Sequence, residues 1–595
     1  MDISFQTGDP KKKKKISKRF WILFLIIVLG VFLRTYHFRD WLDFESDQAR
    51  DTLLVQKELS RGISWPLLGP DMSHSNNPEG LRFHIGPMYY YFQIISGKIF
   101  GVRPETMAYP DLFFSILAIP LFYFFLKKYF SANLSLALTG LFSVSFYLIQ
   151  YSRFAYNPNP TPFFVILFLF SLSKMMDKRE KVSWWWIVSA GIALGVGIQL
   201  HVIPLVLFPA TAFFVFLYLL WKNWRIWKKL VVLIFLILLL NAGQIRSELR
   251  TNFANSKIFL SSIFSSNKNQ SVASHYINNQ YAINYGDDQT APKRFFVNLA
   301  MNADCHIQAN WHMLSSQGDQ FSCDFSYVHL FNYQWTPSSL YHVGDYTDCA
   351  DAYLKKTGVP TLSFIMIIGV LFSIFGYGAL IEYFKREKNI EKKHFLGIIL
   401  LYSLLSFIVM MPVIGDAPIR YFINIFFLPY IFLGLLIVFL SQKFSRKYWW
   451  AAVLIFLFLA VTNAISIKGV VDDIRVGDRS GPNTCGPDVV VLKEIEPMAD
   501  YIINQSLPQN EAYIIGSSRY MFFNPLRFVA HEKNFTFSLV KGMWEVPAGK
   551  SFFYIQDCPS CDFELNIFGY KIDSRKDFGQ VSIYKLENQP VYQEK

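Results

Sequence analysis

The sequence contains few charged residues for its length. Asp, Glu, Lys and Arg make up 17% of its 595 residues, whereas soluble domains carry about 25%. Apolar residues instead form long runs, such as Leu230–Leu240 and Ile431–Leu440. In lipid, such runs satisfy their backbone hydrogen bonds only as helices. The composition therefore excludes a soluble globular protein, a disordered chain and a collagen-like fibre, and it predicts an all-α polytopic membrane protein.

The net charge of +13 reflects where the basic residues lie. Such an excess can indicate nucleic-acid binding, but here 25 of the 57 Lys and Arg residues fall in six short segments between apolar runs. The same segments and the N-terminal tail hold only 6 of the 44 acidic residues. This distribution follows the positive-inside rule, so we expect a lipid bilayer as partner and no nucleic acid. The six segments are Lys11–Arg19, Lys127–Lys128, Lys174–Lys181, Lys222–Lys229, Lys385–Lys393 and Lys443–Lys447.

Hydropathy and the basic segments together predict about eleven membrane spans with a cytoplasmic N-terminus. His84–Gly101 is also apolar, but as a further span it would move every later basic segment to the other side. We therefore expect an interfacial or re-entrant helix on the outer face. The predicted spans are 20–36, 108–126, 131–150, 160–174, 183–200, 203–221, 229–244, 361–384, 394–414, 418–440 and 447–467.

The beginning of the sequence has two interpretations. Five lysines followed by an apolar stretch are typical of a signal peptide. No small-residue cleavage site follows the stretch, and more spans do. We therefore expect an uncleaved first span in a multi-pass protein of the cell membrane.

All cysteines lie in segments that this topology places outside the cell. An even number confined to one face is typical of structural disulfides in an oxidising compartment. Their pairing stays open, and Cys558-Pro-Ser-Cys561 is alternatively a redox or metal-binding pair, although no second such motif supports zinc. The candidates are Cys305, Cys323, Cys349, Cys485, Cys558 and Cys561.

The chain divides into a basic cytoplasmic tail (1–19), a membrane body (20–467) and an outer C-terminal domain (468–595). The body includes a first outer loop at 37–107 and a large outer loop at 245–360. In the C-terminal domain a helical pattern at 489–503 precedes four strand-like runs, which predicts a small extracytoplasmic α/β domain. The four runs are 512–516, 535–540, 551–557 and 580–586.

Carboxylates gather directly after the first predicted span. The sequence there reads Asp43-Phe-Glu45-Ser-Asp47-Gln-Ala-Arg50-Asp51. If 47–62 is helical, Asp47 and Asp51 share a face, and they repel each other unless Arg50 or a ligand offsets their charges. The alternative is structural: Ser46 or Asp47 caps the helix and the remaining charges are solvated.

Polar residues also mark three other ends of spans that this topology places on the outer face. Placing several polar residues at one depth in the membrane costs free energy, so it indicates a binding or catalytic site. Each residue alone also has a structural interpretation, because an arginine can reach the headgroups, a histidine can join two helices, and Asn-Pro pairs form turns. These residues are Arg153, Asn157, Asn159, Gln199, His201, Arg420 and Tyr421.

A carboxylate beside arginines at a membrane surface suits a lipid-linked phosphate substrate. Arginine binds phosphate with charge-assisted, bidentate hydrogen bonds, and a carboxylate can accept the proton of an attacking hydroxyl. Two other functions stay open. A lipid or glycan transporter or flippase would need polar groups near the middle of the membrane, and a non-enzymatic surface-assembly protein would use the spans only as an anchor.

Five signatures in order resemble the multispanning glycosyltransferases of the GT-C fold, which include the protein O-mannosyltransferases of family 39 and aminoarabinose transferase-like enzymes. The resemblance covers about 20–440. The signatures are Glu45-Ser-Asp47-Gln-Ala-Arg50-Asp51, the proline/tyrosine helix from His84-Ile-Gly-Pro87-Met-Tyr89-Tyr90-Tyr91 to Gly101, Ser152-Arg-Phe-Ala-Tyr-Asn-Pro-Asn-Pro160, Gln199-Leu-His201 and Arg420-Tyr421.

The resemblance implies a polyprenyl-phosphate sugar donor and inverting transfer to an extracytoplasmic glycan, lipid or protein acceptor. It makes Asp47 the catalytic base and places Arg420 on the donor phosphate. The family usually has Asp-Glu where this sequence has Asp47-Gln48, so Glu45 is the alternative base. The remaining signature residues are expected to bind substrate: Arg50, Asp51, His84, Tyr89, Tyr90, Arg153, Asn157, Asn159, Gln199, His201 and Tyr421.

No cofactor follows with certainty from the sequence. Metal dependence varies within the GT-C fold, and the sequence contains no strong ligand cluster. A divalent metal therefore stays open as a cofactor.

Overall fold

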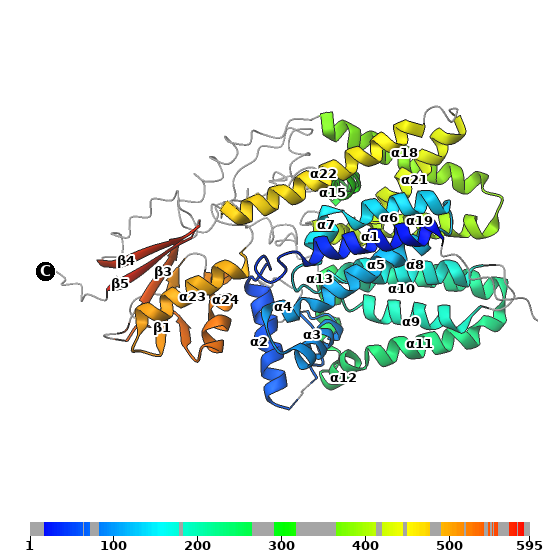
Figure 1. Ribbon diagram of the computed structural model, residues 1–595. Coiled ribbons are helices and arrows are strands. Elements are labelled where there is room, and N and C mark those ends of the chain that lie inside the picture. The colour runs from blue at the N-terminus through cyan, green and yellow to red at the C-terminus, as the bar shows by residue number, and fades with distance from the viewer. Residues whose placement is uncertain are drawn as a thin grey trace, which may run out of the picture.

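The protein consists of a long helical bundle with a small five-stranded sheet beyond one end of it (Figure 1). The structure is a computed structural model. It describes residues 17–62, 65–71, 83–177, 182–264, 291–316, 364–411, 419–443, 449–476, 490–516, 519–540, 545–547, 550, 552–556, 571–579 and 581–587.

Each of the eleven predicted spans coincides with a helix. Five of these helices are long and apolar enough to cross a membrane, and a sixth span results if α11 and the adjoining α12 (Ala242–Arg250), which are bent by 66°, count as one. The number of eleven spans therefore stays a prediction. The helices are α1 (Lys18–Thr35), α5 (Tyr109–Leu126), α6 (Ala132–Ser143), α8 (Thr161–Met175), α9 (Trp184–Gly197), α10 (Val202–Lys222), α11 (Trp227–Leu240), α18 (Phe364–Arg386), α19 (Ile390–Met410), α21 (Leu428–Lys443) and α22 (Trp449–Val476).

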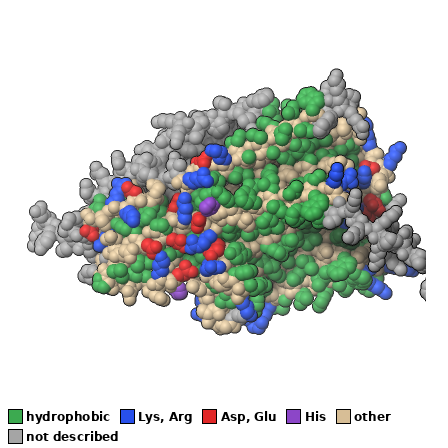
Figure 2. All heavy atoms as spheres, in the orientation of Figure 1, with side chains coloured by type: hydrophobic (Ala, Val, Ile, Leu, Met, Phe, Trp, Pro, Cys, Tyr) green, Lys and Arg blue, Asp and Glu red, His purple; other side chains and the backbone are tan. Residues whose placement is uncertain are grey.

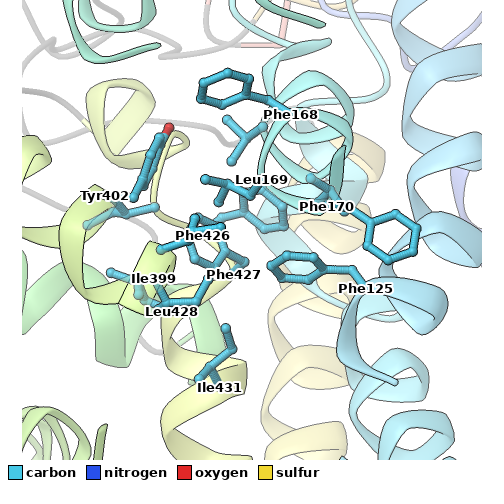
Figure 3. Packing of buried hydrophobic residues seen from close by; sticks show 14 of the residues in the cluster. Phe125, Phe168, Leu169, Phe170, Ile399, Tyr402, Phe426, Phe427, Leu428 and Ile431 are labelled. Atoms are coloured by element: carbon cyan, nitrogen blue, oxygen red, sulfur yellow. The ribbon is translucent and has the colours of Figure 1, made fainter. Parts of the chain in front are cut away.

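Aromatic side chains fill the centre of the bundle. Phe125 of α5 contacts Phe427, from the loop before α21, with ring centroids 6.0 Å apart, and Phe168 of α8 belongs to the same buried cluster (Figure 3). Because lipid gives packed helices no hydrophobic advantage over separated ones, close contact must hold them together. Gly376 illustrates this, since a Cβ atom there would collide with the ring of Phe432 on the neighbouring helix α21.

Further helices lie around the predicted outer end of the bundle. Helix α3 (Met88–Phe100) occupies the segment for which we expected an interfacial helix, and α15 (Ala291–Ser315) lies within the predicted large outer loop. The other helices at this end are α4 (Pro104–Met107), α7 (Phe146–Gln150), α13 (Ala254–Phe264) and α20 (Ile419–Phe422). The short 3-10 helix η1 (Trp224–Ile226) joins α10 to α11 at the opposite end, within the basic segment Lys222–Lys229.

Helix α2 (Ser46–Ser60) carries the acidic motif and begins one residue earlier than expected. Its N-cap is Glu45, which forms a capping box with Gln48, and the Gln48 side chain accepts a 3.2 Å hydrogen bond from the Glu45 amide. The expectation that Ser46 or Asp47 caps the helix is therefore wrong. The capping box occupies Glu45 and leaves Asp47 in the first turn, where the N-terminal dipole favours a negative charge.

The C-terminal unit is a mixed sheet in the order β2-β1-β3-β5-β4. Strand β1 pairs in parallel with β2 and β3, while β5 pairs antiparallel with β3 and β4. All four predicted strands exist, and the sequence interpretation missed α24 and β4. The elements are α23 (Leu492–Ser506), β1 (Glu511–Gly516), α24 (Arg519–Glu532), β2 (Thr536–Leu539), β3 (Phe552–Gln556), β4 (Lys571–Phe578) and β5 (Val581–Glu587).

This unit packs directly against the acidic helix. The Phe44 amide donates a 2.9 Å hydrogen bond to the Val490 carbonyl, and the Leu492 amide donates one of the same length to Leu42. Phe44 also contacts Phe528 of α24 edge to face, with ring centroids 5.6 Å apart. Figure 1 shows α23 and α24 beside α2. The shared hydrophobic core therefore fixes the position of α2 from the C-terminal side.

Charged side chains are concentrated at the two ends of the molecule. Figure 2 shows a broad hydrophobic band over the bundle, with acidic and basic residues gathered near α2 and the C-terminal unit and again at the opposite end. Such a band flanked by charged ends is the surface expected of a bundle embedded in a bilayer.

Candidate active site

Arg50 lies between the two aspartates of α2. Its Nη1 atom donates a 2.9 Å hydrogen bond to Oδ1 of Asp47, and its Nε atom donates one of 2.9 Å to Oδ1 of Asp51. Burial alone would lower the pKa of Arg50, but the charges of Asp51 and Asp47 outweigh it and raise this pKa. The arginine therefore stays charged and offsets the repulsion between the carboxylates.

The two aspartates differ in their access to solvent. The Asp47 side chain is 55% exposed, whereas that of Asp51 is 6% exposed. The Tyr90 hydroxyl of α3 donates a 3.0 Å hydrogen bond to Oδ1 of Asp51. Burial raises the pKa of Asp51 to about 6, although Arg50 acts in the opposite direction. Asp51 thus anchors the cluster to α3, and Asp47 faces outward where it can meet a substrate.

Tyr156 connects this cluster electrostatically with Arg420. Burial raises the pKa of Tyr156, and the charges that act on its hydroxyl include those of Arg420 and Asp47. The Arg420 Cζ atom lies 5.9 Å from the ring centroid of Tyr156 and 5.9 Å from that of Tyr421. Asp47 and Arg420, which are 373 positions apart in the printed sequence, therefore act on one tyrosine at the same end of the bundle.

His201 belongs to the same neighbourhood. Its ring meets that of Tyr421 edge to face, with centroids 4.8 Å apart. Burial and the charge of Arg420 lower the pKa of His201 to about 3, so the ring is neutral at physiological pH. Its Nδ1 atom caps α10 by accepting a 3.4 Å hydrogen bond from the Ile203 amide.

Three of the predicted substrate-binding residues donate hydrogen bonds to backbone carbonyls, and their binding of substrate stays a prediction. Arg153 donates hydrogen bonds to the carbonyls of Arg34 (3.0 Å) and His37 (3.2 Å) at the end of α1. The Asn157 amide donates to the Leu200 carbonyl, and the Asn159 amide donates to Phe154. In this structure these groups shape the loop that presents Tyr156.

Gln199 and His84 hold the chain in position where it enters α3. The Gln199 amide donates to the carbonyls of Gly195 and Leu240, and its Oε1 atom accepts a 3.2 Å hydrogen bond from the Met88 amide. A Cβ atom at Gly86 would collide with this side chain. The His84 amide donates a 2.7 Å hydrogen bond to the Asn255 side chain.

The two tyrosines of α3 have different partners. Tyr89 donates a 2.9 Å hydrogen bond to the buried Asp111 of α5, whereas Tyr90 binds Asp51. Of the two, Tyr90 is the one that the structure joins to the acidic cluster of α2.

Three residues of this region were not among the predicted site residues. Tyr156 stands inside the quoted Ser152–Pro160 signature, which could have identified it. Asn524 of α24 donates a 2.8 Å hydrogen bond to the Ser46 hydroxyl, and no local sequence signal indicated that contact. Arg34 is fully buried and donates to the Ser115 hydroxyl and the Ser143 carbonyl. Because an ionisable residue within a membrane span is costly, the position of Arg34 in a predicted span could have identified it.

Of the disulfide candidates, the structure describes Cys305, which is buried in α15. The other five cysteines lie outside the described residues, so the disulfides stay a prediction. Within the described ranges no three His, Cys, Asp or Glu residues form a group that could hold a metal ion. At α2 the positive charge between the two carboxylates is the guanidinium of Arg50, which fits an arginine-centred site.

The arrangement matches a known structure over nearly its whole length. ArnT from Cupriavidus metallidurans bound to undecaprenyl phosphate superposes with a TM-score of 0.53 at 11% identity, and the match covers 96% of this chain and 98% of ArnT. The chain has the GT-C fold. The expected class, a polytopic helical membrane protein with a small C-terminal sheet, is confirmed with it.

A sequence profile supports the same GT-C assignment over part of the chain. Residues 84–242 match the family described as dolichyl-phosphate-mannose-protein mannosyltransferase. The matched range contains α3, Tyr156 and His201, while α2 and Arg420 lie outside it. No curated protein matches the chain significantly in sequence.

Two further structures superpose less well. ArnT from Cupriavidus metallidurans in the apo state has a TM-score of 0.42 at 13% identity, and the match covers 95% of this chain and 97% of that one. The oligosaccharyltransferase of Archaeoglobus fulgidus in complex with Zn and sulfate also has a TM-score of 0.42, at 12% identity, with coverage of 88% and 62%. The fold assignment rests on the first structure.

Proposed function

We propose that the protein is a membrane glycosyltransferase that moves a sugar from a polyprenyl-phosphate donor to an extracytoplasmic acceptor, with Asp47 as general base. The observation that carries this proposal is the position of an exposed Asp47 beside Arg50, in the same electrostatic neighbourhood as Arg420. The GT-C fold and the undecaprenyl phosphate bound to ArnT support the class of donor.

In the proposed reaction, Asp47 takes the proton of an acceptor hydroxyl as its oxygen attacks the anomeric carbon of the donor sugar. The bond between that carbon and the phosphate oxygen breaks, and its electron pair stays on the phosphate. A polyprenyl phosphate leaves without needing a proton near neutral pH. Attack from the side opposite the phosphate inverts the anomeric configuration.

The arginines supply the positive charge that this reaction needs. Arg420 would bind the donor phosphate, whose negative charge grows as the bond to the sugar breaks. Arg50 holds the Asp47 carboxylate in place beside the buried Asp51. The charges of Asp47 and Arg420 both act on the Tyr156 hydroxyl. This tyrosine would therefore lie between the bound acceptor and the bound donor.

The structure favours Asp47 over Glu45 as the base. Glu45 is the N-cap of α2 and belongs to its capping box, so it has a structural role at the start of the helix. Asp47 follows it in the first turn and is 55% exposed. A general base must reach the proton that it removes, and access is therefore the deciding property.

The test measures release of polyprenyl phosphate and formation of the glycosylated acceptor by mass spectrometry. Purified full chain is supplied with polyprenyl-phosphate donors that carry different sugars, together with membrane glycans, lipids and proteins as acceptors. We expect Asp47→Asn to lower turnover by about 10²–10⁴-fold, the usual scale for loss of a general base. Glu58→Gln, three turns further along α2, is the matched control and should leave turnover unchanged.

Two outcomes would contradict the assignment. Full turnover by Asp47→Asn together with a large loss in Glu45→Gln would transfer the role of base to Glu45. Movement of the lipid-linked donor across proteoliposome membranes, without sugar transfer by the wild type, would favour a flippase instead.

A further inference from the structure

A pocket lies at the opposite end of the bundle from α2. It has a volume of about 330 Å³ and is lined by residues at or near the ends of α8, α10, α18 and α19. Its apolar wall includes Phe214 and Val215 of α10 and Leu401 of α19. This end carries the basic segments that we predict to be cytoplasmic. The proposed transfer reaction does not use it.

Polar groups stand together on one part of the pocket wall. Lys393 and His394 line it from the first turns of α19, and Tyr218 lines it from α10. The Tyr218 hydroxyl lies 2.8 Å from Nε2 of His394, and the Lys393 ammonium lies 5.4 Å from the ring centroid of Phe384. The pocket therefore combines an apolar interior with a basic, hydrogen-bonding end.

The charges around this end are predominantly positive. Lys128 and Lys222 act on His394, as does the acidic Asp177. Asp177 is already paired, however, with Lys128 at 2.5 Å and with Lys174 at 3.7 Å. Glu391 lies in the first turn of α19 and is the acidic residue nearest in sequence to Lys393. The pairing of Asp177 leaves a local excess of basic groups that favours a bound anion.

The pocket is flanked by side chains that face away from the bundle. Phe213 and Leu217 of α10 and Leu404 of α19 are each about half exposed or more. Both helices are long and apolar enough to cross a membrane. In a bilayer, these exposed side chains contact acyl chains, and the basic end of the pocket lies where lipid headgroups begin.

We propose that this pocket binds one anionic phospholipid. The lipid phosphate would lie against Lys393 and His394, and an acyl chain would follow Phe214 and Leu401. Basic pockets between helices on the cytoplasmic side of membrane proteins bind anionic headgroups in this way. A zwitterionic lipid could fill the apolar part equally well but would lack the net charge that the basic end favours.

Native mass spectrometry of the full chain in detergent tests the proposal. Phosphatidylglycerol, phosphatidylcholine and inorganic phosphate are titrated separately, and the bound molecules are counted. We expect one phosphatidylglycerol to bind about fivefold or more tightly than phosphatidylcholine, since each nearby basic residue contributes on this scale. Inorganic phosphate, which lacks acyl chains, should bind much more weakly than phosphatidylglycerol.

Two variants and one control make the outcome specific to the pocket. Lys393→Gln should weaken phosphatidylglycerol by about fivefold and leave phosphatidylcholine unchanged. Leu401→Trp, which fills the apolar part, should weaken both lipids. Lys443→Gln, an exposed lysine at the end of α21, removes the same charge outside the pocket and should change neither.

The proposal is overturned if the wild type binds the two lipids equally, if phosphate alone binds as tightly as phosphatidylglycerol, or if Lys443→Gln weakens binding as much as Lys393→Gln. The thermal unfolding temperature of each variant identifies a folding defect. If Lys393→Gln is unfolded, Leu401→Trp and the lipid preference of the wild type still decide the question.

Discussion

Asn524 in the C-terminal unit donates a 2.8 Å hydrogen bond to the hydroxyl of Ser46, the first residue of α2. The contact joins two parts of the chain that are 478 positions apart. Ser46 immediately precedes Asp47, the proposed base. The C-terminal unit therefore helps to set the position of the acidic cluster, in addition to packing against it through Phe44 and Phe528.

We expect Asn524→Ala to reduce the rate of sugar transfer without abolishing it. A hydrogen bond of this kind contributes about 0.5–1.5 kcal/mol, which corresponds to about a two- to tenfold loss in kcat/KM if it is needed in the transition state. A double-mutant cycle with Ser46→Ala should show that the two losses are not additive. Asn504→Ala, at an exposed position of α23, is the control, and an equal loss in that variant would contradict a positioning role.

Arg50→Lys should impair transfer although it conserves the charge. The guanidinium reaches Asp47 and Asp51 at the same time, each at 2.9 Å, through different nitrogen atoms. A lysine has one compact ammonium group and cannot reproduce this fork. We expect about a tenfold or greater loss in kcat/KM, equivalent to one charged hydrogen bond. Unchanged kinetics in Arg50→Lys would show that only the charge matters.

Arg153 and Arg420 should give opposite phenotypes when each is replaced by methionine. Arg153 binds the carbonyls at the end of α1, so its loss should lower thermal stability by about 1–3 kcal/mol while the folded protein keeps its activity. Arg420 is proposed to bind the donor phosphate, so its loss should reduce transfer about tenfold to a hundredfold with little change in stability. Thermal unfolding and transfer kinetics, measured on both variants, distinguish the roles. The reverse pattern would contradict both assignments.

Asp51 should make stability depend on pH in a specific window. Burial raises its pKa from 3.8 to about 6 in the folded protein. The folded chain therefore binds this proton more tightly than the unfolded chain, and the resulting stabilisation is present below pH 3.8 and lost as the pH rises through about 6. Asp51→Asn should lack this part of the pH dependence. Unfolding temperatures of both proteins between pH 3.5 and 7 provide the measurement, and parallel curves would contradict the raised pKa.

Much of the helical framework was predictable because the bilayer imposes it. Apolar runs such as Leu230–Leu240 must form helices whatever their neighbours are, and each predicted span coincides with a helix. The C-terminal unit was less predictable. Helix α24 contains Pro525, which weakens a helical pattern, and β4 reads Lys-Ile-Asp-Ser-Arg-Lys-Asp-Phe, whose polar residues suit an edge strand and do not resemble a buried one.

The candidate site, too, could be predicted only in part from the sequence. The acidic motif, His201 and Arg420 could be selected from the sequence, because ionisable groups near membrane boundaries are costly and therefore informative. The sequence could not distinguish Arg153 from Arg420. Both are arginines at span ends, and only their partners show that the former holds helix α1 while the latter lies beside Tyr156.

The sequence by itself determined that this is a helical membrane protein, which segments form its main helices and which polar residues deserved consideration, since hydropathy and charge act locally along the chain. Tertiary structure decided which of those residues meet. It joined Asp51 to Tyr90, set Arg420 beside Tyr156 and held α2 against a C-terminal sheet unit. These contacts depend on how segments far apart in the sequence pack together, and local sequence patterns do not predict that packing.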